Sequence, residues 1–387
     1  MEVHYSLGDD QRAVKDLVQR VAREKVAPRA HEIDRRAEYP EDMFQLLREL
    51  GLFTLPFPVA YGGSGSLLSG CVAVEELGRV CYNTAYLLVV QWTAFGAILA
   101  GGTPAQRALW LPDLASGAKR ASISVTEPQS GSDVAGIRTR ATEIDGGFRI
   151  RGAKAWCTGA PVADFIVVAA KTGLEGRAGI ELFIVERDRA GLVIGRKEDK
   201  LGGRGMPSCE LFFEDVEVPF ENRLGTGGTG FKAVMEGFNA ARPVIAARAV
   251  GLAQGATDLA VEFVSNRHTF GTRVSDNQGI RWMIADMTTR TEAARNLTYR
   301  AASMVDQGIT GKELAMAAAM SKLFSTDIAM QVAIDAVQLF GAAGASNDSP
   351  INRYMRDAKL LQIVEGTNQI QRNIIAQALM GRPGTAR

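Results

Sequence analysis

Glu365 is the residue whose setting in this sequence best suits chemistry. It follows the apolar run 360–364 and precedes Gly366 and Thr367, a pair typical of the end of one helix and the cap of the next. A carboxylate at such a helix break, flanked by apolar side chains, is partly desolvated, and its pKa rises. A general base that works near neutral pH needs this property. On spacing alone, an exposed glutamate at a helix end is the commoner alternative.

Two further motifs contain groups suited to a polar ring or a phosphate. The stretch 126–133 combines hydroxyls with glycine after an apolar run, and 156–158 reads Trp-Cys-Thr. Each is weak alone, because Ser/Gly/Asp clusters are mostly turns and a lone tryptophan is mostly a core residue. Residues 225–230 match GxGxxG. No buried strand precedes them in a βαβ unit, so we interpret them as a linker and not as a dinucleotide site.

The cysteines and histidines exclude several other kinds of site. The four cysteines form no CxxC pair, so neither a zinc site nor a disulfide framework is expected, and no metal site is predicted. Three scattered histidines leave little room for a Ser-His or Cys-His pair. An enzyme with this sequence would depend on a carboxylate base or on a cofactor. The residues in question are Cys71, Cys81, Cys157, Cys209, His4, His31 and His268.

The composition is that of a soluble globular protein. Among 387 residues, 44 Lys plus Arg nearly cancel 43 Asp plus Glu, so we expect no binding to nucleic acid or to an anionic membrane. The sequence has no run of about 18 purely apolar residues and no charged-then-apolar beginning. We therefore expect no membrane span, no secretion signal and a cytoplasmic location.

Three segments with different residue patterns must position the candidate residues. Residues 1–120 are predicted to be helical from apolar stripes at helical spacing. Residues 121–230 contain short β-type runs between Gly, Asp and Pro, which predicts a small antiparallel sandwich or barrel. Residues 231–387 contain long Ala-rich amphipathic segments, the last over 350–380, as in a four-helix bundle. The predicted fold is mainly α with a middle β domain.

Together these motifs resemble those of a known family. They occur in the order and spacing of the acyl-CoA dehydrogenases, and the resemblance covers nearly the whole chain. It implies the same helical, β, helical order of domains. The stretches that carry the resemblance are 122–136, 153–158, Arg242-Pro243, 267–271, 335–338 and 355–372.

The resemblance implies that the protein binds FAD between the middle domain and the C-terminal bundle. The adenosine and pyrophosphate would cross a subunit interface, where a guanidinium offers a phosphate two parallel donors. A helix start would add further donors. Around the flavin ring the implied contacts are Val125, Thr126, Gly131, Ser132, Trp156 and Thr158. For the rest of the cofactor they are Arg267, Thr269, Phe270, Gln278, Gln338, Gly341, Thr367 and Gln369.

The reaction implied by the resemblance is the α,β-desaturation of an acyl thioester, as in fatty acid β-oxidation. Glu365 would remove the α-proton while the β-hydrogen leaves as hydride to flavin N5. The Glu365 N–H and a ribityl hydroxyl would polarise the thioester carbonyl. Arg242 would lie behind the base as the second catalytic residue. The implied substrate contacts are Ser132, Phe238, Asn239, Arg242 and Gly366.

Single positions narrow the substrate class that the resemblance implies. Ala241 stands where some members carry the base, which leaves that role to Glu365. The segment 86–95, expected to line the acyl pocket, contains no arginine for a second carboxylate. This disfavours glutaryl-type substrates and favours short- to medium-chain or branched acyl groups. Asn239 replaces a common acid, and Cys157 replaces a branched aliphatic residue as a small buried hydrophobe.

The implied partners are acyl-CoA, an electron-transferring flavoprotein and three further copies of the chain in a dimer of dimers. Two other enzyme classes use the same residues: an acyl-CoA oxidase, and a dehydrogenase of carrier-protein thioesters. A non-enzymatic alternative is a partner subunit that binds flavin structurally. Glu365 and Arg242 count against that alternative.

Overall fold

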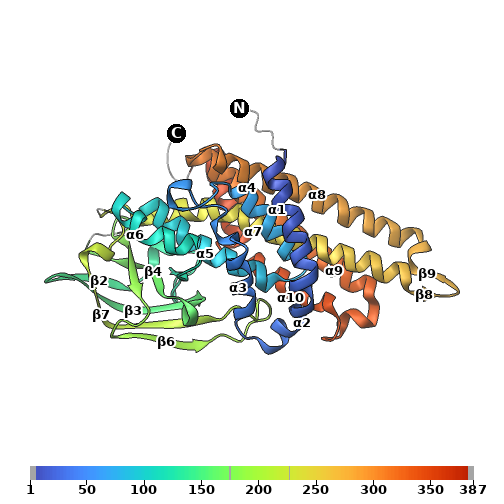
Figure 1. The fold of residues 1–387 in the computed structure, drawn as a ribbon, viewed down its shortest axis with the longest axis horizontal. Coiled ribbons are helices and arrows are strands. Elements are labelled where there is room, and N and C mark those ends of the chain that lie inside the picture. The colour runs from blue at the N-terminus through green and yellow to red at the C-terminus, as the bar shows by residue number, and fades with distance from the viewer. Residues whose placement is uncertain (1–5, 174–175, 226, 382–387) are drawn as a thin grey trace.

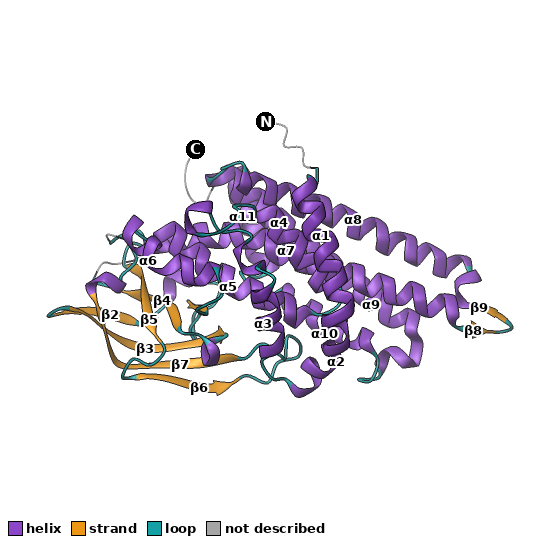
Figure 2. Cartoon of the chain, viewed as in Figure 1, coloured by secondary structure: helices purple, strands orange, loops and turns teal. Residues whose placement is uncertain are grey.

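The chain folds as helices, then a sheet, then helices. The computed structural model describes residues 6–173, 176–225 and 227–381. The sheet lies at one end of the molecule, and the long C-terminal helices extend away from it to the opposite end (Figure 1). Helices dominate the whole, with strands confined to the sheet and one small hairpin (Figure 2). The predicted fold, mainly α with a middle β domain, is confirmed.

The N-terminal helices surround an uncharged central helix, α5. All twenty residues of α5 lack charge, and most are buried against α4, α7 and the first strand. A helix that is apolar on every side belongs in the interior, so the other helices are arranged around it. The helices of this part are α1 (Asp9–Val21), α2 (Ala27–Arg36), α3 (Glu41–Glu49), α4 (Leu67–Gly78), α5 (Tyr82–Gly101) and α6 (Pro104–Ala115).

The middle domain is one mixed sheet. Its order is β1-β4-β2-β3-β7-β6, with β5 paired to β4. Most pairs are antiparallel as predicted, but β1 and β2 both run parallel to β4, and sequence periodicity does not encode such long-range pairings. The strands are β1 (Ala121–Ser124), β2 (Arg140–Ile144), β3 (Gly147–Thr158), β4 (Phe165–Lys171), β5 (Ile180–Glu186), β6 (Leu192–Lys197) and β7 (Ser208–Pro219).

Strand β4 fixes the sheet against the helices. Successive side chains of a strand point to opposite faces. Phe165, Val167 and Ala169 accordingly join the large core shared with the helices, whereas Ile166 and Val168 join a second core on the other face. Strand β4 is therefore buried on both faces. Its neighbour β1 packs against α5.

The C-terminal part has three long helices and two short ones. A hairpin of β8 (His268–Thr269) and β9 (Thr272–Arg273) links the first two. The helical segment 350–380 is divided into two helices by a turn at 362–367, where the sequence predicted a helix break. The helices are α7 (Gly230–Asn266), α8 (Gln278–Asp306), α9 (Gly311–Phe340), α10 (Pro350–Leu361) and α11 (Asn368–Met380).

Three helical stretches are long and apolar enough to cross a membrane by length and composition. They are α5, α7 and Gly311–Ala345. The expectation of no membrane span rests on unbroken apolar runs, whereas mean hydropathy also accepts interspersed polar residues, and that expectation stays a prediction. Most of the apolar window is buried inside the protein in α5 and α7, and a smaller share in the third stretch.

Candidate active site

Glu365 lies in the turn between α10 and α11. Its backbone is left-handed, with φ of 55°, and Gly366 follows with φ of 86°. A non-glycine residue in this region is uncommon and is held there by its surroundings. Thr367 then caps α11, its hydroxyl accepting the Ile370 N–H at 3.3 Å. The helix break and cap expected from the sequence are thus present.

The Glu365 carboxylate is desolvated and lacks a hydrogen bond on one oxygen. The residue is partly exposed as a whole, yet its Oε2 is buried and has no hydrogen-bond partner among the described residues. Burial raises the pKa of Glu365, opposed by the positive charges of Arg242, Arg248 and Lys322. An unpaired carboxylate oxygen with a raised pKa can accept a proton from a bound molecule.

Arg242 is buried on α7 beside that carboxylate. Its side chain is held by Asn239, one helical turn earlier, whose Oδ1 accepts from Nη1 at 2.5 Å. Burial lowers the pKa of Arg242 to about 10, and the charge of Glu365 opposes this shift. The guanidinium remains a cation at neutral pH. Asn239, predicted as a substrate contact, therefore orients Arg242 in this structure.

Lys322 on α9 holds the turn that carries Glu365, and the sequence reasoning missed it. Its Nζ donates to the Gly366 carbonyl and to Asn368 Oδ1, both at 2.9 Å. The side chain is fully buried. Burial lowers the pKa of Lys322 to about 7, while the Glu365 charge opposes that shift. The sequence feature that could have indicated Lys322 is that it is the single lysine within the apolar, Ala-rich stretch 314–323.

Replacing Lys322 with methionine should move the pH dependence of the reaction. The positive charge of Lys322 lowers the pKa of Glu365, so its loss raises that pKa further. The acidic limb of kcat/KM, which follows ionisation of the base, should move to higher pH. The exposed Lys312 at the start of the same helix provides the control, and Lys312→Met should leave the profile unchanged. An unshifted limb in Lys322→Met would contradict this electrostatic role.

A buried ion pair fixes the start of the loop at 125–133. Lys154 Nζ on β3 donates to Glu127 Oε1 at 2.8 Å and to the Val125 carbonyl at 3.1 Å. Glu127 also accepts the backbone N–H groups of Arg138 and Thr139. Burial would raise the pKa of Glu127, but Lys154 and these donors outweigh it and hold that pKa at about 2.

Beyond this pair the loop opens to solvent. Val125 is buried and Thr126 is half-buried, whereas Gly131 and Ser132 are exposed. A Cβ added at Gly131 would meet nothing within 4 Å. The predicted loop residues therefore line an accessible surface that a rigid ion pair supports.

Trp156 lies at a bulge near the end of β3. The register between β3 and β7 shifts between Lys154 and Cys157, and Trp156 takes φ of 60° there. The residue is 56% exposed, so the interpretation of a lone tryptophan as a core residue is wrong for Trp156. A bulge re-aims a side chain, and the conformation is strained for a bulky residue. Cys157 is buried, as expected for a small hydrophobe.

Thr158 connects the sheet to α5. Its hydroxyl lies 2.9 Å from Ser208 Oγ on β7 and 3.5 Å from the Tyr86 hydroxyl on α5. The Tyr86 ring is in turn covered by the guanidinium of Arg248, a buried α7 residue that also influences Glu365. Contacts thus lead from Thr158 through Tyr86 to Arg248, whose positive charge lowers the pKa of Glu365.

The remaining predicted residues fall into two places. Phe238 on α7 packs partly buried against the core, and Gln369 is exposed at the start of α11. A second group lies at or near the β8–β9 hairpin, which projects from the end of the molecule opposite the sheet (Figure 1). All members of that group are exposed: Arg267, Thr269, Phe270, Gln278, Gln338 and Gly341.

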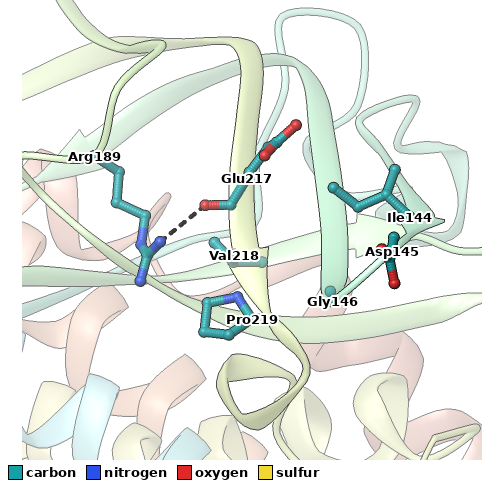
Figure 3. Close-up of a pocket in the computed structure, with 8 residues that line it drawn as sticks. Ile144, Asp145, Gly146, Arg189, Glu217, Val218 and Pro219 are labelled. Carbon is teal, nitrogen blue, oxygen red and sulfur yellow. Dashed lines mark hydrogen bonds between the residues drawn. The ribbon is translucent and has the colours of Figure 1, made fainter.

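A hollow on the middle domain is separate from these residues. It measures about 280 Å³ and is lined by the β2–β3 turn and the end of β7. Within it, Arg189 donates to the Glu217 carbonyl at 3.0 Å (Figure 3). Arg189 also pairs with Glu186, and the Glu217 carboxylate pairs with Arg149. The charges of Arg189 and Glu217 are thus paired with other residues, and the hollow contains none of the predicted site residues.

Comparisons with known proteins cover nearly the whole chain. Residues 8–118, 122–216 and 228–380 match family models described as the N-terminal, middle and C-terminal domains of acyl-CoA dehydrogenase. Cyclohexane-1-carbonyl-CoA dehydrogenase of Geobacter metallireducens is 40% identical over 380 residues, which are 97% of this chain and 99% of that protein.

Two solved structures share the fold. Butyryl-CoA dehydrogenase from Megasphaera elsdenii superposes with a TM-score of 0.94 at 37% identity, over 97% of this chain and 100% of that chain. A chain in a structure described as the electron transferring flavoprotein of Acidaminococcus fermentans gives 0.94 at 38% identity, over 98% and 100% of the two chains. The likeness therefore includes the helices and the sheet alike.

Proposed function

Since this chain belongs to the acyl-CoA dehydrogenase family, whose members are FAD-dependent oxidoreductases acting on CH–CH groups, we propose that it converts a short- to medium-chain or branched acyl-CoA to the trans-2-enoyl-CoA. Such a step belongs to fatty acid β-oxidation, and a cytoplasmic location fits it. The observation that carries the proposal is the buried Glu365 Oε2, which has no hydrogen-bond partner among the described residues.

The residues around β3 fit FAD. The ring of Trp156 is exposed in a strained conformation, Thr158 offers a hydroxyl, and Gly131 leaves open space beside the loop. These residues, with Val125, Thr126 and Ser132, would hold the flavin ring. When bound, FAD accepts the β-hydrogen as hydride. The protein supplies orientation, desolvation and the base.

Glu365 would take the α-proton of the thioester. Its raised pKa places it closer to a weakly acidic carbon acid than an exposed glutamate would be. Its backbone N–H would polarise the thioester carbonyl, where negative charge develops as the proton leaves. The left-handed conformation at Glu365 and Gly366 determines where that N–H points.

Two cations would keep this base in place and active. Arg242, held by Asn239, opposes protonation of Glu365 and so maintains its ionised form. Lys322 acts through the backbone by fixing the Gly366 carbonyl. Arg242 is thus proposed as the residue that sets the charge at the site, and Lys322 as a positioning residue.

A second copy of the chain would complete the cofactor site. Trp156 and Thr158 are on the sheet, whereas Arg267 and Phe270 are on the hairpin at the other end of the molecule (Figure 1). Phe270 is fully exposed in the single chain, and an exposed aromatic at a hairpin tip suits an interface. This separation supports an assembly in which one cofactor bridges two subunits, within a dimer of dimers.

Replacing Arg267 with alanine should loosen FAD and weaken the oligomer together. The guanidinium offers bidentate donors to a pyrophosphate, and loss of such a charged contact corresponds to about 10-fold or more in cofactor affinity. FAD released on gel filtration and the oligomer mass are the measurements. The exposed Arg281 on α8 is the control, and Arg281→Ala should behave as the parent protein. Unchanged FAD retention in Arg267→Ala would contradict the bridging arrangement.

The electron acceptor and the thioester carrier distinguish the enzyme classes. We propose an electron-transferring flavoprotein as acceptor, supported by the likeness to a chain in a structure of that description. After anaerobic reduction by acyl-CoA, slow reoxidation in air together with fast reoxidation by the flavoprotein is expected. Fast reoxidation by air would instead indicate an oxidase. Faster reduction by a carrier-protein thioester of the same acyl group would indicate a carrier-dependent dehydrogenase.

A further inference from the structure

Arg248 is a fully buried cation whose guanidinium makes no hydrogen bond with the described residues. None of Nε, Nη1 and Nη2 has a partner, and the side chain is 0% exposed. It also forms no ion pair within the described part of the chain. Arginine is planar with five donors, so a buried arginine normally engages a carboxylate, a phosphate or several carbonyls.

Two aromatic rings are the neighbours that Arg248 does have. Its guanidinium carbon lies 4.2 Å from the ring centre of Tyr82 and 4.0 Å from that of Tyr86. Cation–π contacts offset only part of the desolvation penalty of a buried charge. They also occupy the faces of the guanidinium and leave its edge, where the N–H groups lie, for an acceptor.

The nearby acid is already engaged elsewhere. Asp357 on α10 accepts the Gly203 N–H at 2.7 Å and lies near Arg353 and Arg356. Lys200, which adds positive charge close to Arg248, donates to the Met206 carbonyl and to Ser208 Oγ. The cation is therefore left without a counter-charge from this group of residues.

Arg248 lies near the residues proposed to bind the acyl group. Its positive charge lowers the pKa of Glu365, and the hydroxyl of its neighbour Tyr86 lies 3.5 Å from the Thr158 hydroxyl. An acyl group bound between Glu365 and Thr158 would extend toward the rings of Tyr82 and Tyr86, with its far end beside Arg248. Three basic side chains act on Glu365, and two of them are already held by other groups: Arg242 by Asn239, and Lys322 by Gly366 and Asn368, with Asp327 near it. Arg248 is the one of the three that has no hydrogen bond with the described residues, and this favours an anionic ligand group beside it.

We propose that Arg248 is a specificity-determining residue that binds a carboxylate at the far end of the acyl group. The preferred substrate would then be a mono-CoA thioester of a short dicarboxylic acid. This inference rests on the proposed dehydrogenation. It reverses the expectation drawn from the arginine-free segment 86–95, because the arginine comes from α7 and packs across Tyr86. Arg248 and Tyr86 are far apart in the sequence, so the sequence alone did not predict their contact.

The test compares substrates that differ in one charge. The holoenzyme is assayed with succinyl-, glutaryl- and adipyl-CoA, with the monomethyl ester of each, and with unsubstituted acyl-CoAs of equal length. At one length at least, the free carboxylate should exceed its ester in kcat/KM by about 10- to 100-fold, as expected for a buried charge-assisted pair. Wild-type preference for the ester or the unsubstituted acyl group at every length would overturn the proposal.

Arg248→Met separates a substrate role from a structural one. It should abolish the preference for the carboxylate while leaving kcat/KM for the unsubstituted acyl-CoA within a few-fold, when parent and variant are each assayed at their own pH optimum, because the charge of Arg248 also lowers the pKa of Glu365. Its melting temperature should equal or exceed that of the parent, because methionine removes a buried unpaired charge. A lower melting temperature with equal loss on all substrates would overturn the proposal. Arg353→Met is the control, since Arg353 is a buried arginine whose Nη2 donates to the Val80 carbonyl. It should leave the substrate ratio unchanged.

Failure of this inference is distinguishable from failure of the proposed function. If unsubstituted acyl-CoAs reduce the bound flavin but carboxylates gain nothing, only the role of Arg248 is wrong. If no acyl-CoA of either kind reduces the flavin, the dehydrogenation itself is wrong.

Discussion

Glu365→Gln should lower the rate of flavin reduction by acyl-CoA about 10³- to 10⁴-fold, the upper range of what a positioned general base contributes. Glutamine has nearly the same shape but cannot act as the base, and Glu365 is the one carboxylate whose charge acts on Arg242 among the described residues. FAD content and oligomer mass should stay at the parent values. Single-turnover reduction under anaerobic conditions is the measurement.

The stability of this variant supplies a second readout. The native pKa of Glu365 is raised, so the native state holds its proton to higher pH than the unfolded state does. Stability therefore falls as pH rises through that native pKa, and glutamine removes this loss. Glu365→Gln should melt at or above the parent temperature at neutral pH. Glu313→Gln, at an exposed position on α9, is the control and should behave as the parent protein. Near-normal turnover in Glu365→Gln would contradict the assignment of Glu365 as the base.

Lys154→Met should lower the stability of the protein by about 3 kcal/mol or more, because it leaves the buried Glu127 charge without its cation. The ion pair joins β3 to the loop that begins at Val125, so the same change should also weaken FAD retention. Denaturation of the holoenzyme by urea and the FAD released on gel filtration measure the two effects.

Two comparison variants isolate the buried charge. Glu127→Gln combined with Lys154→Met should recover part of the lost stability, since no uncompensated charge remains. Arg149→Met breaks an exposed pair with Glu217 that joins the same strand, β3, to β7, and it should change stability by about 1 kcal/mol or less. A loss in Lys154→Met no larger than that in Arg149→Met would show that the buried pair is not a main support of the loop.

The features that the sequence could predict are local ones. The turn at Glu365, the cap at Thr367 and the helical and β texture all follow from neighbouring residues, and each is present. A helix break needs only the residues around it. The same holds for the buried small side chain of Cys157 within a strand.

Features that depend on distant pairing could not be predicted in this way. Lys322 meets Gly366 from another helix, and Arg248 meets Tyr86 across more than 160 positions of chain. The exposure of Trp156 depends on a bulge that exists only when β3 pairs with β7. Periodicity indicates which face of an element is apolar, and it does not specify which polar side chain from elsewhere reaches a given turn.

The central claim is that Glu365 removes a proton from the α-carbon of an acyl-CoA while the β-hydrogen leaves as hydride. The most direct measurement is anaerobic stopped-flow reduction of the flavin in the holoenzyme by acyl-CoA with hydrogen or deuterium at the α-carbon. We expect the oxidised-flavin absorbance to be lost, more slowly with deuterium at the α-carbon, and we expect almost no loss in Glu365→Gln. Failure of every acyl-CoA to reduce the flavin, or equal rates in the parent and Glu365→Gln, would contradict it.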